Sequence, residues 1–322
     1  MKKWLLVIAQ ALVSVILLYF LLRRPELREQ AGSILHVPQP GWLVAGFISV
    51  GICNLLSAAR WGIFLQVVGI RISKWEVLRL SWIGLFCNNF FVGAVGGDAV
   101  KTVWLCSKGN RRVSSLVSVL LDRMSGLGAM VLCGSVLMWL RWDLLSQSET
   151  VSSVMHFMII YLVGLTALMT LSFITAIPSL TKLLPMWVPG RSPYITFTNE
   201  YFKFVQEWRK ALLGGLISIG ILLGYLLSFY FTARAFGLGI PVLDFLSFMP
   251  AVDVISALPI SLGGFGVREQ LFVTILGQLF STPIALAFAV SIVGAALNLL
   301  WSFGGIALLP SYGYLLRAKN DA

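Results

Sequence analysis

Hydrophobic residues along the chain gather in six long runs that few charged residues interrupt. A helix needs about 20 predominantly apolar residues to cross the hydrocarbon core of a bilayer. The six runs have about that length, and they cover 4–22, 41–59, 113–140, 153–177, 211–233 and 283–309. The pattern therefore predicts six membrane-spanning helices.

Two further apolar regions, 77–106 and 242–281, do not have the pattern of simple spans. Glycines and ionisable residues interrupt each of them in the middle, and Pro250 and Pro259 also interrupt the second. Irregular backbone at membrane depth is tolerated only where protein buries it or where it lines a water-filled cavity. We therefore predict that each region forms a re-entrant pair of helices, which enters and leaves the membrane on one side.

The composition agrees with this pattern and decides the fold class. Of the 322 residues, 58% are hydrophobic and only 11% are charged, which is more apolar surface than a soluble domain of this size can bury. The prediction is an all-α polytopic membrane protein with a single integral-membrane domain over 1–322. The first run lacks a small-residue cleavage site, so we expect it to stay as an uncleaved helix.

The basic residues predict the orientation. The chain has 24 Lys and Arg against 13 Asp and Glu, which gives a formal net charge of +11. With the N-terminus in the cytoplasm, most basic residues fall in cytoplasmic segments, as the positive-inside rule requires. Both termini are then cytoplasmic, in a cell (inner) membrane, and the expected partners are anionic lipid headgroups. No folded basic domain is left over that would bind nucleic acid.

Two short elements, FVGAVGGDAVKTV (91–103) and LPISLGGFGVREQ (258–270), share a skeleton. The pair Gly96-Gly97 aligns with Gly263-Gly264, and Lys101 aligns with Arg268. Because three predicted crossings per half make the second half begin on the opposite side of the membrane, we predict two inverted repeats, at about 1–140 and 153–322.

The glycine pairs are the first candidate binding elements. If one half-helix starts at Gly97 and another at Gly264, their free N–H groups point into the membrane interior and attract an anion such as phosphate. The other interpretation, in which the glycines only permit close helix packing, is also open. The candidate substrate-binding residues are Gly96, Gly97, Asp98, Lys101, Arg123, Gly263, Gly264 and Arg268.

Several acidic residues lie within or beside these elements. Asp98 either caps its half-helix or pairs with a basic residue of the other repeat. Asp122 and Arg123 are neighbours on a helix and point about 100° apart, so we expect each to find a different partner. Asp122, Asp253 and Glu269 are candidates for either ion pairing or proton coupling.

Polar residues elsewhere have plainer interpretations. Asn88 and Asn89 are expected to form interhelical hydrogen bonds or to line the cavity. We interpret Arg60-Trp61 as an anchor at the membrane interface, where the second span ends. The segment 178–210 is expected to be a cytoplasmic amphipathic loop, with a helix that Thr198 or Asn199 caps and a face of Tyr201, Val205, Trp208 and Leu212.

The motif search favours transport over catalysis. The four cysteines and two histidines do not have the spacing of metal ligands, and the chain has no nucleotide-binding or hydrolase fingerprint. We therefore expect no metal, no cofactor and no enzymatic activity.

Three motifs resemble a known family. NNFFVGAVGGDAVKTVWL, LLDRMSGLG and PISLGGFGVREQLF occur in this order, and they resemble the family of the lysylphosphatidylglycerol synthase transmembrane domain, which comprises flippase-like bacterial and archaeal membrane proteins. The resemblance covers essentially the whole chain and implies a domain that carries lipids between leaflets. Bifunctional members add a soluble aminoacyl transferase, which the 322 residues do not contain, so we do not expect aminoacylation here. Lys101 stands where members usually have arginine, which keeps the charge but loses the bidentate fork.

The leading hypothesis is a lipid translocase, flippase or scramblase-like, for an anionic or aminoacylated phospholipid or a polyprenyl-linked lipid. Alternating access of the two repeats would move the headgroup. One alternative is an integral-membrane transferase with a lipid-linked substrate, for which Glu26 and Glu29 are the candidate carboxylates. A small-anion transporter and a partner of a lipid-modifying enzyme are further alternatives, and the oligomeric state is open.

Overall fold

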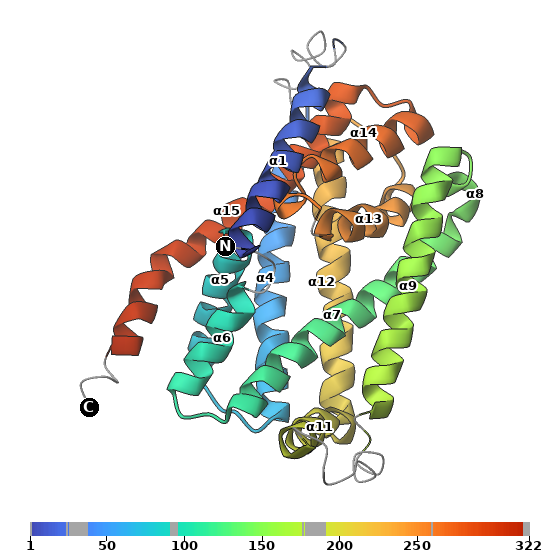
Figure 1. Ribbon diagram of the computed structural model, residues 1–322. Coiled ribbons are helices and arrows are strands. Elements are labelled where there is room, and N and C mark those ends of the chain that lie inside the picture. The colour runs from blue at the N-terminus through green and yellow to red at the C-terminus, as the bar shows by residue number, and fades with distance from the viewer. Residues whose placement is uncertain are drawn as a thin grey trace. The chain divides into compact units, whose positions relative to one another are not determined.

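The computed structural model describes residues 2–23, 25, 38–90, 96–175, 177, 191–258 and 260–317. Every regular element among these residues is a helix, and Figure 1 shows their order along the chain. The predicted all-helical fold class is therefore confirmed. Glu26 and Glu29, the candidate carboxylates of the transferase hypothesis, lie outside the described residues.

Each of the six apolar runs forms one long helix. These helices are α1 (Lys2–Leu22), α4 (Gly41–Val67), α7 (Arg112–Leu140), α9 (Glu149–Thr175), α12 (Trp208–Ala235) and α15 (Ile284–Arg317). Within the described residues, five helices are long and apolar enough to cross a membrane, namely α4, α7, α9, α12 and the part Ile284–Leu308 of α15. The role of α1 as a sixth span stays a prediction, as does the orientation of the termini.

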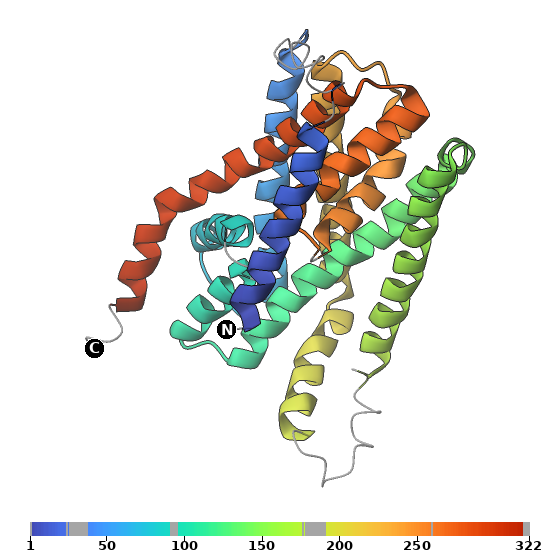
Figure 2. The same ribbon diagram turned by 45° about the horizontal axis from the view of Figure 1, so that its top comes forward.

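The two interrupted regions break into helix pairs, as the sequence predicts. In the first pair, α5 (Lys74–Phe90) packs against α6 (Gly96–Ser107). In the second pair, α13 (Val242–Ala257) is followed by the 3-10 turn η1 (Leu262–Gly264) and packs against α14 (Val267–Phe280). Both pairs can be followed in Figures 1 and 2. That either pair re-enters the membrane stays a prediction.

The chain forms two compact units. Unit 1 comprises Met1–Gly51, Leu132–Tyr161 and Leu223–Trp301, and unit 2 comprises Ile52–Val131, Leu162–Leu222 and Ser302–Ala322. Unit 2 contains the first helix pair, and unit 1 contains the second pair together with the short helix α8 (Trp142–Leu145). Each unit takes residues from both halves of the chain, and the division into inverted repeats stays a prediction.

The core of unit 2 is built around large aromatic side chains. Trp61 and Phe64 of α4 and Trp104 of α6 are buried together, with residues of α5, α7 and α11 (Arg191–Gln206) around them. Large rings bury the most apolar area per residue. A Cβ added at Gly214 of α12 would lie 2.5 Å from the Phe64 ring, so this glycine lets α12 approach the core.

The core of unit 1 is formed by packed phenylalanines. Phe229 of α12 stacks on Phe272 of α14 with 5.7 Å between ring centroids, and Phe245 of α13 contacts the same ring. α1 lies against η1 and α14 (Figure 1), where the backbone N–H of Leu262 donates a hydrogen bond to Ser14 Oγ at 2.8 Å. These contacts hold the second helix pair within unit 1.

The segment 178–210 differs from its prediction. α11 begins at Arg191, so Thr198 lies inside the helix, where its hydroxyl donates to the Ile195 carbonyl oxygen at 3.1 Å. The chain turns at Glu207 and continues as α12. The predicted apolar face is split because the Tyr201 ring packs into the core, whereas Val205, Trp208 and Leu212 are exposed. Residues 178–190 lie outside the described part of the chain.

Candidate functional site

The α5–α6 pair closes at two glycines. A Cβ added at Gly97 would lie 2.1 Å from the Gly84 carbonyl oxygen, so only glycine permits this approach of the two backbones. The Gly97 N–H donates a hydrogen bond to Asn88 Oδ1 at 2.8 Å. The start of α6, at Gly96, agrees with the predicted half-helix, but the Gly97 N–H is bound to α5 and is not free for an anion.

Arg60 of α4 and Asp122 of α7 form a buried ion pair. Arg60 Nε lies 2.7 Å from Asp122 Oδ1, and the two side chains are only 10% and 12% exposed. Arg60 also donates to Ser218 Oγ at 2.8 Å. The interpretation of Arg60-Trp61 as an interface anchor is therefore wrong. Because α4 continues to Val67, both residues lie inside the helix, and Trp61 is fully buried.

A second ion pair joins α6 to α7. Arg123 Nε lies 2.7 Å from Asp98 Oδ2. The expectation that Asp122 and Arg123 find different partners is confirmed. Asp98 pairs with a basic residue, as one of its two interpretations predicted. The partner, Arg123, comes from the neighbouring helix α7 of the same half of the chain and not from the other repeat.

Lys101 of α6 lies among these charges. Its side chain is buried, and the Nζ atom lies 4.5 Å from the centroid of the Trp61 ring. A desolvated ammonium over an indole ring gains about 2 kcal/mol from this cation–π contact. The Lys101 ammonium is attracted by Asp122 and Asp98 and repelled by Arg123 and Arg60.

These side chains line a polar cavity of about 180 Å³ within unit 2. Three cationic and two anionic side chains face it, which leaves one positive charge in excess: Arg60, Lys101, Arg123, Asp98 and Asp122. The cavity is smaller than ordinary small-molecule sites of about 300–1,000 Å³. It therefore fits a compact polar group and not a whole lipid.

Two polar atoms at this cavity lack a partner. Asn54 Nδ2 and Ser81 Oγ are buried and have no hydrogen-bond partner among the residues that the structure describes. Buried polar atoms in folded proteins almost always form hydrogen bonds. Donors without a partner, beside an excess positive charge, fit the oxygen atoms of an anionic group.

The structure brings five of the predicted residues to this cavity: Asn88, Asp98, Lys101, Asp122 and Arg123. Asn89 is exposed and does not line it.

Sequence reasoning missed Asn54, Ser57, Arg60 and Ser81, which also line the cavity. The signal for three of them was present, because polar residues at 54, 57 and 60 recur every three positions and so share one face of an apolar helix.

The second glycine pair has a different geometry. Gly263, Gly264 and Gly266 have φ angles of 61°, 81° and 87°, a left-handed backbone that favours glycine. The prediction that a half-helix starts at Gly264 is therefore wrong, since α14 begins only at Val267. Arg268 is the second residue of α14 instead of lying one turn inside it.

Asp253 and Glu269, the two acidic candidates in unit 1, are hydrogen bonded. Asp253 Oδ1 accepts a hydrogen bond from the Tyr225 hydroxyl at 3.0 Å, and Arg268 attracts the same carboxylate electrostatically. The fully buried Glu269 accepts from the Gly266 N–H at 2.5 Å and from Ser291 Oγ at 3.0 Å. These bonds favour the structural interpretation of Glu269.

The helices and the charged cavity define a polytopic membrane protein with a buried polar site. The family model described as the lysylphosphatidylglycerol synthase TM region matches residues 7–303. The chain therefore belongs to this family, whose members are membrane proteins linked to lipid handling. A UPF0104 membrane protein of Pyrococcus horikoshii is 30% identical over 114 residues, which cover 33% of this chain and 30% of that protein.

Proposed function

We propose that the protein is a lipid translocase, flippase or scramblase-like, that moves an anionic or aminoacylated phospholipid or a polyprenyl-linked lipid between leaflets. The observation that carries this proposal is the cavity of unit 2, which has an excess positive charge and two polar atoms without a hydrogen-bond partner among the described residues. It lies beside α4 and α7, two of the helices that are long and apolar enough to cross a membrane. A charged site among such helices is costly, which is why function is its default interpretation.

The lipid phosphate would take the place of one existing partner in the cavity. The Arg123 side chain is 44% exposed, whereas its partner Asp98 is 17% exposed. Arg123 is therefore the accessible cation, and a phosphate can exchange with the Asp98 carboxylate for it. Lys101 and Asn54 would donate further hydrogen bonds to the phosphate oxygens while the acyl chains stay in the bilayer. The Arg60–Asp122 pair, already satisfied and buried, would hold α4 against α7.

The predicted topology is a further part of this proposal. Six spans including α1, two re-entrant pairs and two inverted repeats would place both termini in the cytoplasm, in the inner membrane. Regular α-helices satisfy their own backbone within the bilayer, and the basic residues would lie mainly on the cytoplasmic side.

Transbilayer movement of fluorescent phosphatidylglycerol in proteoliposomes tests the proposal. A membrane-impermeant quencher reports the fraction of probe in the outer leaflet. We expect wild-type protein to expose the inner-leaflet probe, and we expect Lys101→Gln to slow this step. Lys108→Gln is the matched control, because Lys108 is exposed just after α6 and does not line the cavity.

The same vesicles distinguish the alternatives. If lysyl-phosphatidylglycerol or a polyprenyl phosphate moves between leaflets and phosphatidylglycerol does not, the proposed substrate changes and the proposed mechanism stays. Release of trapped phosphate without lipid movement would favour the small-anion transporter. Equal lipid movement by wild type and Lys101→Gln would remove the cavity from the proposal.

A further inference from the structure

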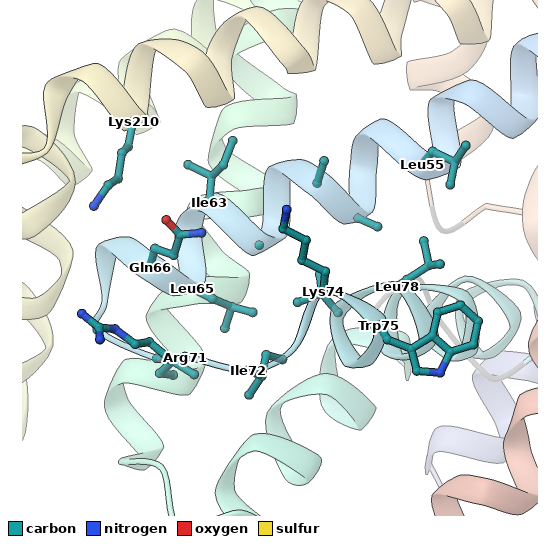
Figure 3. Close-up of a pocket in the computed structure, with 16 residues that line it drawn as sticks. Leu55, Ile63, Leu65, Gln66, Arg71, Ile72, Lys74, Trp75, Leu78 and Lys210 are labelled. Atoms are coloured by element: carbon teal, nitrogen blue, oxygen red, sulfur yellow. The ribbon is translucent and has the colours of Figure 1, made fainter.

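A groove of about 1,010 Å³ runs along α4, the connection to α5 and the first turns of α5 (Figure 3). Its residues on α4 include Leu55, Ala59, Gly62 and Gln66, which recur every three or four positions and so form one face of the helix. The α4 residues of the polar cavity lie on the opposite face, because each residue turns the helix by about 100°. The groove is therefore a separate site of unit 2.

The wall of this groove is apolar and faces outward. Ala59 and Gly62 are small and keep the groove open along the helix, and Ile63 and Leu78 add apolar surface. α4 is long and apolar enough to cross a membrane, so its exposed face would meet lipid. The wall thus has the character of a surface that contacts acyl chains.

Three basic side chains lie around the groove. Arg71 comes from the α4–α5 connection, Lys74 from the start of α5 and Lys210 from α12, as Figure 3 shows. Arg71 and Lys74 are exposed. Lys210 forms an ion pair with Glu207 at 3.2 Å, but both side chains are well exposed, and such surface pairs contribute little.

The acid nearest to this basic cluster in sequence is engaged elsewhere. Glu76 Oε2 accepts hydrogen bonds from the Ser73 N–H and the Ser73 hydroxyl, both at 3.1 Å, and the Ser73 hydroxyl accepts from the Glu76 N–H. This is a capping box at the start of α5. Because the Glu76 carboxylate serves the helix cap, Arg71 and Lys74 present positive charge at the groove.

Trp75 follows Lys74 at the start of α5 and lies on the Leu78 side of the groove in Figure 3, away from Arg71 and Lys210. Its side chain is 64% exposed, although it is large and apolar. Exposed tryptophans next to basic residues are typical of the headgroup level of a membrane, where the indole N–H meets water and the ring meets lipid. The start of α5, where Lys74 and Trp75 are adjacent, therefore has the chemistry of a headgroup region.

We infer that this groove binds an anionic glycerophospholipid of the surrounding leaflet, with the phosphate between Arg71 and Lys74 and an acyl chain along α4. A row of apolar side chains that ends in basic residues fits a lipid with a negative headgroup. A soluble anion would not need the apolar wall. The inference goes beyond the proposed function, since binding here does not require transport.

A photoreactive residue in the groove can identify its occupant. Ile63 is replaced by benzoylphenylalanine, and the protein is placed in vesicles of equal phosphatidylglycerol and phosphatidylcholine. Mass spectrometry of the cross-linked adducts then gives the ratio of the two lipids at this position. The same replacement at Leu168, an exposed residue of α9 outside the groove, reports the lipid around the protein.

We expect phosphatidylglycerol to be enriched roughly fivefold in the Ile63 adducts relative to the Leu168 adducts, because each basic residue near the surface favours anionic lipid. Arg71→Gln together with Lys74→Gln should abolish the enrichment. The control pair Arg111→Gln and Arg112→Gln removes two exposed charges, just before α7 and at its first residue, and should leave the enrichment unchanged.

Three outcomes would overturn the inference. They are equal adduct ratios at the two positions, an enrichment that survives the loss of Arg71 and Lys74, and adducts to a second copy of the chain instead of lipid. Transport is measured separately on the same preparations. Failed transport with an enriched groove would refute the proposed function alone, and intact transport without enrichment would refute only the inference.

Discussion

The two broken helix pairs meet the same requirement with different residues. In each pair an N–H group at the start of the second helix needs an acceptor. In the first pair the Gly97 N–H donates to Asn88 from the other helix, α5. In the second pair the Gly266 N–H donates to Glu269 of its own helix, α14. The start of α6 is therefore capped by a residue of another helix, whereas the start of α14 is capped by a residue of its own helix.

This difference changes what the remaining charges do. Because Asn88 provides the acceptor in the first pair, Asp98 and Lys101 can interact with Arg123 and Trp61 around a polar cavity. In the second pair the buried Glu269 is used for the cap, and phenylalanines of α13 pack on Phe272 of α14. Similar glycine elements thus lie beside a charged cavity in unit 2 and beside packed phenylalanines in unit 1.

Removing one aspartate from each unit should give the largest contrast. Asp122→Ala leaves the buried Arg60 guanidinium without its carboxylate, and loss of one partner of a buried pair costs about 3–5 kcal/mol. Asp253→Ala leaves the Tyr225 hydroxyl without its acceptor, which costs about 1–3 kcal/mol. Denaturant titration in detergent measures the free energy of unfolding of both variants.

A double variant separates the lost ion pair from other effects of the substitution. Arg60→Met with Asp122→Leu replaces the pair by apolar side chains, and such replacements are often neutral. We expect the double variant to be more stable than Asp122→Ala. If Asp253→Ala destabilises the protein as much as Asp122→Ala, the contrast between the buried ion pair of unit 2 and the hydrogen-bonded aspartate of unit 1 is wrong.

Alanine substitutions at Gly97 and Gly264 should give the next largest difference in stability. Gly97→Ala places a Cβ 2.1 Å from the Gly84 carbonyl oxygen, and only a shift of whole helices relieves this overlap, so we expect a loss of about 3 kcal/mol. In Gly264→Ala the new Cβ would lie 2.7 Å from the Ser256 carbonyl oxygen, at a residue with a φ of 81°. Because the short turn can adjust, we expect a loss of stability of about 2 kcal/mol. The midpoint of thermal unfolding ranks the two variants.

Gly164→Ala is the control for both substitutions. This glycine lies within α9, and a Cβ there meets no neighbouring atom of the described residues within 4 Å. Alanine in a helix interior is favoured over glycine by about 1 kcal/mol, so this variant should be as stable as wild type or more so. Tolerance of Gly97→Ala would contradict the close packing of α5 and α6.

Transport should depend more on the first pair than on the second. Lys101→Gln removes a buried ammonium from the cavity, and hydrogen bonds to charged groups contribute about 1.5–3 kcal/mol, so we expect transport to slow about tenfold or more. Arg268→Gln should slow it less, because Arg268 interacts with Asp253 in unit 1. Lys101→Arg keeps the charge and should restore most of the rate. Equal losses at Lys101 and Arg268 would instead favour two symmetric headgroup sites.

Much of the fold could be predicted because the membrane constrains the sequence. Apolar runs of about 20 residues became long helices, and glycine pairs marked both interruptions. Pro250, by contrast, lies inside α13 and does not break it. The error at Gly264 has a local cause. Three left-handed glycines in η1 and after it keep the backbone out of the α-helix until Val267, and no apolar pattern reports their φ angles.

The candidate site was predicted only in part. Asp98, Lys101 and Arg123 were visible because ionisable residues are costly within apolar segments. The predicted second run, 41–59, stops before Arg60, its first basic residue, although the helix continues to Val67. Arg60 was therefore expected at the membrane interface instead of inside the helix. The partners could not be predicted, since Arg60 and Asp122 lie 62 positions apart and meet only through tertiary packing.

The smallest expected loss of stability comes from Asn88→Ala, which tests most directly how the starts of α6 and α14 are capped. Asn88→Ala removes the acceptor of the Gly97 N–H, and the loss of one hydrogen bond costs about 1 kcal/mol. The exposed neighbour Asn89 provides the control, since Asn89→Ala should leave the stability unchanged. Glu269→Ala removes the acceptor of both the Gly266 N–H and the Ser291 hydroxyl, so it should cost about 2 kcal/mol.

Hydrogen exchange distinguishes a cap between helices from a local one. Because Asn88 joins α5 to α6, its loss should raise amide exchange at the start of α6 and also at the end of α5. Glu269 belongs to the helix that it caps, so its loss should raise exchange at the start of α14 and leave α13 protected. Exchange confined to α6 in Asn88→Ala would mean that the first break is closed as locally as the second. The charged cavity would then need an explanation other than the position of its cap.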